Sequence, residues 1–88
     1  MGKLKCIKID GVDLWFWPND HGRHFHAKRK GEWEFKVSFL ENDATMFELV
    51  WNAKKKQMSK ADREMLVKEI VAHRQEILKE WEMKVNPS

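Results

Sequence analysis

Hydrophobic and polar residues alternate strictly across residues 32–39. Trp33, Phe35, Val37 and Phe39 are separated by charged or small polar side chains. Successive side chains of a β-strand point to opposite faces, so this pattern predicts a strand with one face in a core and the other toward solvent. Less regular alternation predicts further strands over residues 3–9, 12–17, 23–30 and 46–51.

The residues between these segments are typical of turns. Asp10-Gly11 lies between two apolar runs and predicts a type I′ hairpin turn, in which both central residues have positive φ. Residues 18–22 contain proline, asparagine, aspartate and glycine, and Lys30-Gly31 makes the next break. An antiparallel sheet with short connections is therefore expected.

The strand expected over residues 12–17 carries large apolar groups on both faces. Leu14 and Phe16 share the face expected to meet the helix, so Trp15 and Trp17 point away from it. Exposed aromatic patches often mark protein contacts, which makes these two tryptophans a predicted partner interface unless a loop covers them. In the last strand the residues expected to point inward are Phe47, Leu49 and Trp51.

After residue 59 the hydrophobic period becomes that of a helix. Ser59 and Asp62 resemble a capping box with Asp in place of Glu. Arg74 falls inside the apolar arc, which indicates a buried ion pair, a snorkelling arginine or a break between two shorter helices. The arc consists of Leu66, Val67, Ile70, Val71, Ile77, Leu78, Trp81 and Val85.

These patterns predict a single α+β domain over residues 1–88. Its antiparallel sheet of four to five strands (about residues 3–51) is packed against one long or two short C-terminal helices (about residues 60–84). With one cysteine, Cys6, the chain has no internal disulfide, and no apolar run is long enough for a membrane span. We expect a cytoplasmic protein without membrane contact or cofactor.

The formal net charge of +3 is distributed unevenly. Residues 23–30 and 52–60 each hold four cations and no acid. Such clusters attract phosphate, although short lysine runs also occur in solvated loops. The candidate RNA- or phosphate-binding residues are Arg23, Lys28, Arg29, Lys30, Lys54, Lys55 and Lys56.

Three histidines and a carboxylate lie within residues 20–26, namely Asp20, His21, His24 and His26. In one interpretation the histidines are catalytic: one takes a proton from an RNA 2′-hydroxyl and another protonates the leaving oxygen, without a metal. In a second interpretation the histidines and Asp20 bind a divalent metal. In a third they are polar residues of a solvent-facing strand or a partner-binding surface.

Two segments carry a resemblance to a known family. They are Asp20-His21 with His24-Phe25-His26, and residues 73–78 followed by Trp81-Glu82. Over most of its length the chain resembles the prokaryotic domain-of-unknown-function family numbered 4160, which has Pro-Pro in a three-residue gap where this chain has only Gly22-Arg23. The resemblance implies a β-rich start, a helical end and the toxin side of a two-gene toxin-antitoxin pair. It marks as candidate positions, without roles, His21, His24, His26 and His73.

The leading prediction is thus a small intracellular toxin of a toxin-antitoxin pair that acts on RNA through its histidine and basic face. A cognate antitoxin-like protein would bind it, and any enzymatic activity would be ribonuclease-like and metal-independent. One alternative is a non-catalytic module that binds RNA or protein. Another is a metal-binding protein that uses the histidine cluster. A homo-oligomer is compatible with each.

Overall fold

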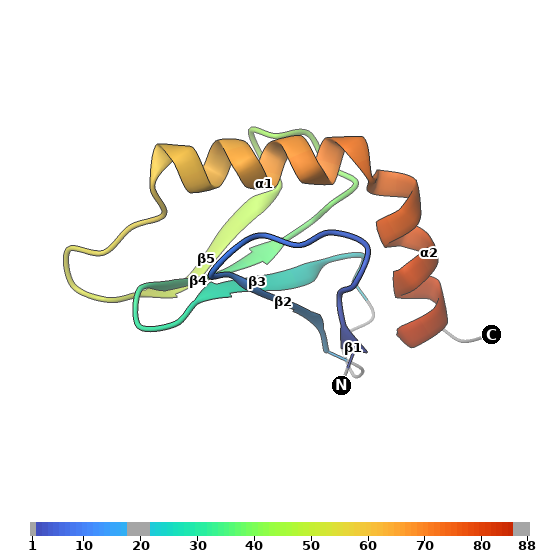
Figure 1. Ribbon diagram of the computed structural model, residues 1–88, viewed down its shortest axis with the longest axis horizontal. Helices are drawn as coiled ribbons and strands as arrows, with labels where there is room; N and C mark the ends of the chain where they lie inside the picture. The colour runs from blue at the N-terminus through green and yellow to red at the C-terminus, as the bar shows by residue number, and fades with distance from the viewer. Residues whose placement is uncertain (1, 18–21, 86–88) are drawn as a thin grey trace.

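The computed structural model describes residues 2–17 and 22–85. The strands are β1 (Gly2–Lys3), β2 (Asp13–Phe16), β3 (Phe25–Arg29), β4 (Trp33–Val37) and β5 (Phe47–Asn52), and the helices are α1 (Lys60–Ala72) and α2 (Arg74–Lys84). The strands form one antiparallel sheet in the order β1-β2-β3-β4-β5. Helix α1 runs over one face, α2 descends at the end where β1 lies, and neither of these described helices covers the other face (Figure 1). The predicted α+β fold is confirmed.

The core fills the space between the sheet and the two helices. The residues that are fully buried there include Phe16, Phe25, Trp33, Val37, Leu66, Ile70 and Ile77. Burying a side chain of this size stabilises the fold by roughly 1.5–3 kcal/mol. The alternation in β2 and β4 therefore predicted their core faces correctly.

The segment before β2 differs from the prediction. Of the strand expected over residues 3–9, only Lys3 belongs to a strand, and the rest is a loop that delivers Leu4 to the core. The backbone N–H groups of Lys5 and Cys6 donate to the carboxylate of Glu80 on α2, at 2.7 and 3.0 Å. Donors used in this way do not form a ladder with β2, so the chain leaves the sheet after β1.

The turn before β2 is confirmed, but not its type. The Val12 N–H donates to the Ile9 carbonyl at 3.1 Å, which closes a tight turn around Asp10-Gly11. Gly11 has a φ of 76°, whereas Asp10 is not among the described residues with positive φ. A type I′ turn needs positive φ at both positions, so that assignment is wrong.

In β5, two of the predicted inward residues are not buried. Leu49 is 51% exposed and Trp51 is 37% exposed. Phe35 opposes Leu49 and Glu34 opposes Trp51, with a register shift between these pairs, so Val50 is the extra residue of a β-bulge. The bulge places Trp51 on the face of Glu34, away from the helices. Leu49 stays on the helix side, at the open edge of the sheet.

A break divides the C-terminal helical segment, as one alternative predicted. His73, with φ −126° and ψ 22°, separates α1 from α2. Arg74 is half-buried and donates from Nη2 to the Glu41 carbonyl at 2.7 Å. Ser59 caps α1 by accepting from the Asp62 N–H at 3.0 Å, which confirms the Ser59 half of the predicted capping box, whereas the Asp62 carboxylate accepts from Arg29. Val71, at the margin of the predicted arc and one residue before α1 ends, is exposed.

Candidate functional site

The sheet face without helices is called the open face below. Its composition follows from the strand register, in which Trp15 opposes His26 and His26 opposes Lys36. Side chains directly opposite each other in a sheet share a face. The described residues that make up the open face are Lys3, Asp13, Trp15, Trp17, His24, His26, Lys28, Glu34, Lys36, Glu48 and Trp51.

Four rings pack together at the β2–β3 end of the open face. The Trp15 ring stacks on the His26 ring, with centroids 5.5 Å apart and an interplanar angle of 22°. Trp17 meets both rings edge-on at 6.1 Å. His24 lies edge-on to His26 at 5.5 Å, which confirms that the two histidines share a face. Only Trp17 of this cluster is classed as exposed, at 42%.

Both histidines are more buried than residues of a solvent-facing strand should be. His24 is 6% exposed and His26 is 8% exposed. The Glu34 carboxylate lies 3.6 Å from Nδ1 of His26, so a protonated His26 would pair with it. Sequence reasoning missed Glu34 because the register that places it near His26 is not visible in alternation alone. Little imidazole surface is available for direct contact with a substrate.

Asp20 and His21, the remaining members of the predicted catalytic and metal sets, lie outside the described residues. Among residues 2–17 and 22–85, no three His, Cys, Asp or Glu side chains are grouped so that they could hold a metal ion. The metal alternative and the catalytic role of His21 stay predictions. His73 lies between α1 and α2, and its Nδ1 lies 2.9 Å from the Glu69 carbonyl in α1.

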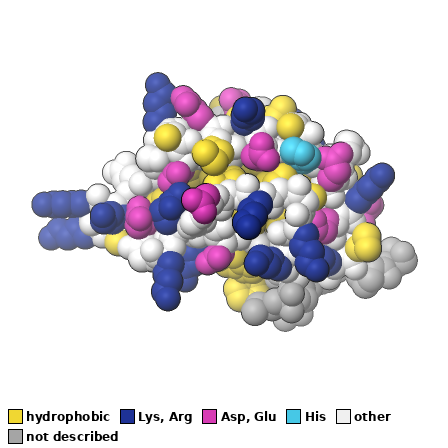
Figure 2. Space-filling view, in the orientation of Figure 1, with side chains coloured by type: hydrophobic (Ala, Val, Ile, Leu, Met, Phe, Trp, Pro, Cys, Tyr) yellow, Lys and Arg dark blue, Asp and Glu magenta, His cyan; other side chains and the backbone are white. Residues whose placement is uncertain are grey.

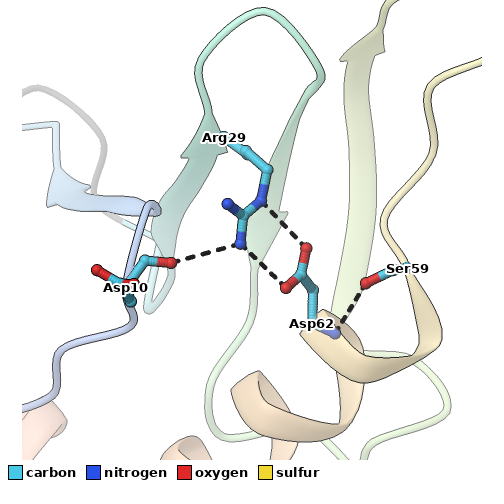
Figure 3. Close-up of polar contacts among 4 residues, drawn as sticks. All are labelled: Asp10, Arg29, Ser59 and Asp62. Atoms are coloured by element: carbon cyan, nitrogen blue, oxygen red, sulfur yellow. Dashed lines mark hydrogen bonds and ion pairs between the residues drawn. The ribbon is translucent and has the colours of Figure 1, made fainter.

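The structure disperses the first basic cluster of the sequence. Arg29 points to the helix side, where Nε and Nη2 donate to the Asp62 carboxylate at 3.1 and 3.0 Å, and Nη2 also reaches the Asp10 carbonyl at 3.4 Å (Figure 3). The Arg23 guanidinium lies over the Trp81 ring at 5.8 Å. Arg29, one of the predicted phosphate-binding residues, thus connects β3 to the start of α1.

Lys30, the last residue of the first basic cluster, lies with the second basic cluster at one end of the molecule. The Ala53 N–H donates to the Glu32 carbonyl at 2.9 Å, which holds the loop after β5 against the β3–β4 turn. Lys and Arg side chains project from this end, at the left of Figure 2. We call the exposed set Lys30, Lys54, Lys55 and Lys56 the basic end.

Trp51 connects the basic end with the open face. The Lys28 ammonium lies over the Trp51 ring, 5.9 Å from its centroid. A cation in this position is attracted by the negative face of the ring. Sequence reasoning missed Trp51 as a surface residue because the bulge at Val50 is not readable from periodicity.

A groove of about 510 Å³ opens on the same face. Trp15 and Trp17 supply its aromatic wall, and Lys28 and Glu34 supply charge. Aromatic walls with a few polar groups are typical of ligand sites. The groove thus combines the predicted partner tryptophans with one of the predicted phosphate ligands.

The surroundings of Cys6, the single cysteine of the chain, disfavour its thiolate form. Burial first, and then its hydrogen bond to Glu80, raises the pKa of Cys6 to about 12. The thiol stays protonated at neutral pH, and only the thiolate is a nucleophile. Burial by itself raises the pKa of Glu80, but hydrogen bonds from Lys84, Lys5 and Cys6 lower it overall.

No described helix has the length and apolar character needed to cross a bilayer. No protein-family model matches the chain, and no curated protein or solved structure is significantly similar to it. The resemblance to the family numbered 4160 rests on the quoted residues alone and stays a prediction.

Proposed function

We propose that this chain binds single-stranded RNA on the open face of its sheet. The observation that carries the proposal is a sheet face that no described helix covers, on which Trp17 and Trp51 are exposed and Lys28 lies over the Trp51 ring. Single-stranded RNA is commonly bound by stacking its bases on aromatic side chains of a sheet while cations hold its backbone.

The rings are arranged as two separate platforms. Trp15 and Trp17 lie at β2, and Trp51 lies on β5, three strand spacings away, or about 14 Å. The Trp15–His26 stack and the Lys28–Trp51 contact fix ring orientations before a ligand arrives. Preformed platforms reduce the entropy cost of binding. We therefore expect one RNA strand to cross the sheet from β2 to β5.

The open face carries as many acids as lysines, so its charge adds little net attraction to phosphate. Lys3, Lys28 and Lys36 lie among Asp13, Glu34 and Glu48. The basic end adds four lysines beyond Trp51, with Glu32 in the adjoining β3–β4 turn. Stacking is therefore expected to contribute most of the affinity on the open face, and the basic end about half of the salt dependence.

Fluorescence anisotropy with a labelled twelve-nucleotide oligouridylate tests the proposal. Base stacking contributes about 1–3 kcal/mol per base, so Trp17→Ala and Trp51→Ala should each weaken binding by about 5- to 150-fold. Met83→Ala, at a residue that is 75% exposed on α2, is the control and should leave affinity unchanged. Equal affinity of all three variants, or tighter binding of duplex RNA, would contradict the proposal.

The toxin role, the antitoxin partner and catalysis by the histidines stay predictions, and a cleavage assay separates them from simple binding. Because His24 and His26 are buried, we expect the bound RNA to stay intact. Cleavage by the parent that is lost in His24→Ala, while the variant still binds RNA, would instead support the ribonuclease-like toxin.

A further inference from the structure

The outer edge of β5 offers unpaired backbone groups next to an apolar pocket. Within residues 2–17 and 22–85, β5 pairs only with β4 and is the last strand of the sheet. The Ser38 N–H donates to the Met46 carbonyl at 2.8 Å, so these two opposed residues form a hydrogen-bonded pair. In an antiparallel ladder such pairs alternate with non-hydrogen-bonded ones. The N–H and C=O groups of Phe47 and Leu49 therefore point away from β4, to the open edge.

The side chains of the same two residues line a pocket of about 480 Å³ on the helix side of the sheet. Phe35, Met58 and Arg63 complete most of its wall. The Arg63 guanidinium lies over the Phe47 ring, 5.2 Å from its centroid, so a cation stands at the rim. Outward backbone groups and a side-chain pocket therefore coincide at Phe47 and Leu49.

Together these features fit a defined kind of partner. We infer that β5 accepts an extended segment of a partner protein as a sixth strand, with a large apolar side chain in the pocket and acidic residues toward Arg63 and the basic end. Strand addition obtains affinity from main-chain hydrogen bonds and specificity from pockets for alternate side chains. The cations around this edge select an acidic segment by charge complementarity.

A second copy of the chain fits the edge less well. Pairing the outward residue Phe47 of one copy with Leu49 of another, in a two-fold antiparallel arrangement, places the Glu48 side chains of both copies directly opposite each other. Like charges in that position destabilise a strand pair.

The test is a selection of displayed random twelve-residue peptides against the whole protein, followed by affinity measurement on the enriched peptide. We expect enrichment of extended sequences with one large apolar residue and acidic neighbours. Amide hydrogen exchange should then slow at Phe47 and Leu49 when the peptide is added. Failure to enrich any sequence, or protection on the open face instead of β5, would overturn the inference.

Two variants separate the edge from the rest of the fold. Leu49→Pro removes one outward N–H that does not pair with β4. It should lower the affinity for the peptide by about tenfold. Leu49→Asp keeps that N–H but repels an acidic segment by its charge. It replaces the proline variant as the test if the proline variant does not fold. Trp17→Ala should leave peptide affinity unchanged, so this result is independent of RNA binding. A β5-dependent dimer in sedimentation would show that a second copy is the occupant and would contradict the inference.

Discussion

Arg29 and Asp62 show how neighbouring residues of one basic run acquire different roles. Arg29 on β3 makes two hydrogen bonds to a carboxylate in the first turn of α1, whereas its neighbour Lys28 points to the open face. Adjacent residues of a strand face opposite sides, so a run of cations in sequence is divided between two surfaces.

The Arg29–Asp62 pair should contribute measurably to stability. Both side chains are about three-quarters buried, and hydrogen bonds between charged groups contribute about 1.5–3 kcal/mol. Asp62→Asn should lower the free energy of unfolding in urea by about that amount. Lys60→Gln is the control, because its partner Glu64 is 4.0 Å away and both are exposed, so a loss below about 0.5 kcal/mol is expected. Equal losses of unfolding free energy in Asp62→Asn and Lys60→Gln would mean that the buried Arg29–Asp62 pair contributes no more to stability than an exposed pair.

Lys28 should contribute to RNA binding, whereas Arg29 should contribute to stability. Lys28→Gln removes a cation from the open face, so RNA affinity should fall and its salt dependence should decrease by about 0.7 in slope. Arg29→Gln should leave RNA affinity unchanged in the folded protein while lowering the melting temperature. If Arg29→Gln lowers RNA affinity more than Lys28→Gln does, RNA does not bind on the open face.

The carboxylate of Glu80 should make stability depend on pH. Its pKa is lower in the folded chain than the ordinary value of 4.5. The contribution to stability is therefore fully present above pH 4.5 and is lost as pH falls through the folded-state pKa. The difference in unfolding free energy between the parent and Glu80→Gln should shrink below pH 4.5. Glu82→Gln, at an exposed position of the same helix, should show no such change.

At the scale of elements, β5 determines what the two faces of the sheet present. Val50 is the extra residue between Leu49 and Trp51, and the strand changes face there. Because regular alternation also places adjacent residues on opposite faces, removing Val50 would leave Leu49 and Trp51 on the faces they now occupy.

Deletion of Val50 is therefore expected to be tolerated. The pairs formed by Leu49 and Trp51 with β4 can both persist in a regular strand, so RNA affinity should stay near that of the parent. Trp51→Ala, by contrast, should lower RNA affinity. Anisotropy titrations and thermal melts of both variants provide the measurement, and a deletion variant that folds but loses RNA as Trp51→Ala does would show that the bulge itself positions the ring.

The elements that follow a simple period could be predicted from sequence. The alternation in β4 and the helical period after Ser59 both predicted buried core residues correctly. The loop after β1 could not be predicted, because it depends on Glu80 far along the chain, and neither could the face of Trp51, because a bulge resets the period. Alternation placed His24 and His26 on one face, but their burial depends on Trp15 and Trp17 from a neighbouring strand.

At the scale of the whole molecule, cations are concentrated at one end. The Ala53–Glu32 hydrogen bond unites lysines from two distant parts of the chain there. Single-stranded RNA loses about 0.7 counterions per neutralised phosphate, so contacts from three open-face lysines and Lys54, Lys55 and Lys56 predict a log–log salt slope of about −4.

Replacing Lys54, Lys55 and Lys56 with glutamine should reduce this slope to about −2. The control replaces three exposed lysines elsewhere, Lys8, Lys68 and Lys79, which changes net charge equally without touching the basic end. Titrations of the same oligouridylate across a range of potassium chloride concentrations give the slopes. Identical slopes for the two triple variants would show that net charge, and not its location, attracts RNA.

The bulge in β5 also has a thermodynamic consequence, because one strand belongs to both surfaces. Trp51 faces the proposed RNA platform, while Phe47 and Leu49 face the edge pocket. A strand added along β5 that flattens the bulge would rotate Trp51 away from RNA. Thermodynamic linkage then requires reciprocity. The factor by which bound peptide lowers the affinity for RNA equals the factor by which bound RNA lowers the affinity for the peptide. Such a molecule releases one ligand as it takes the other.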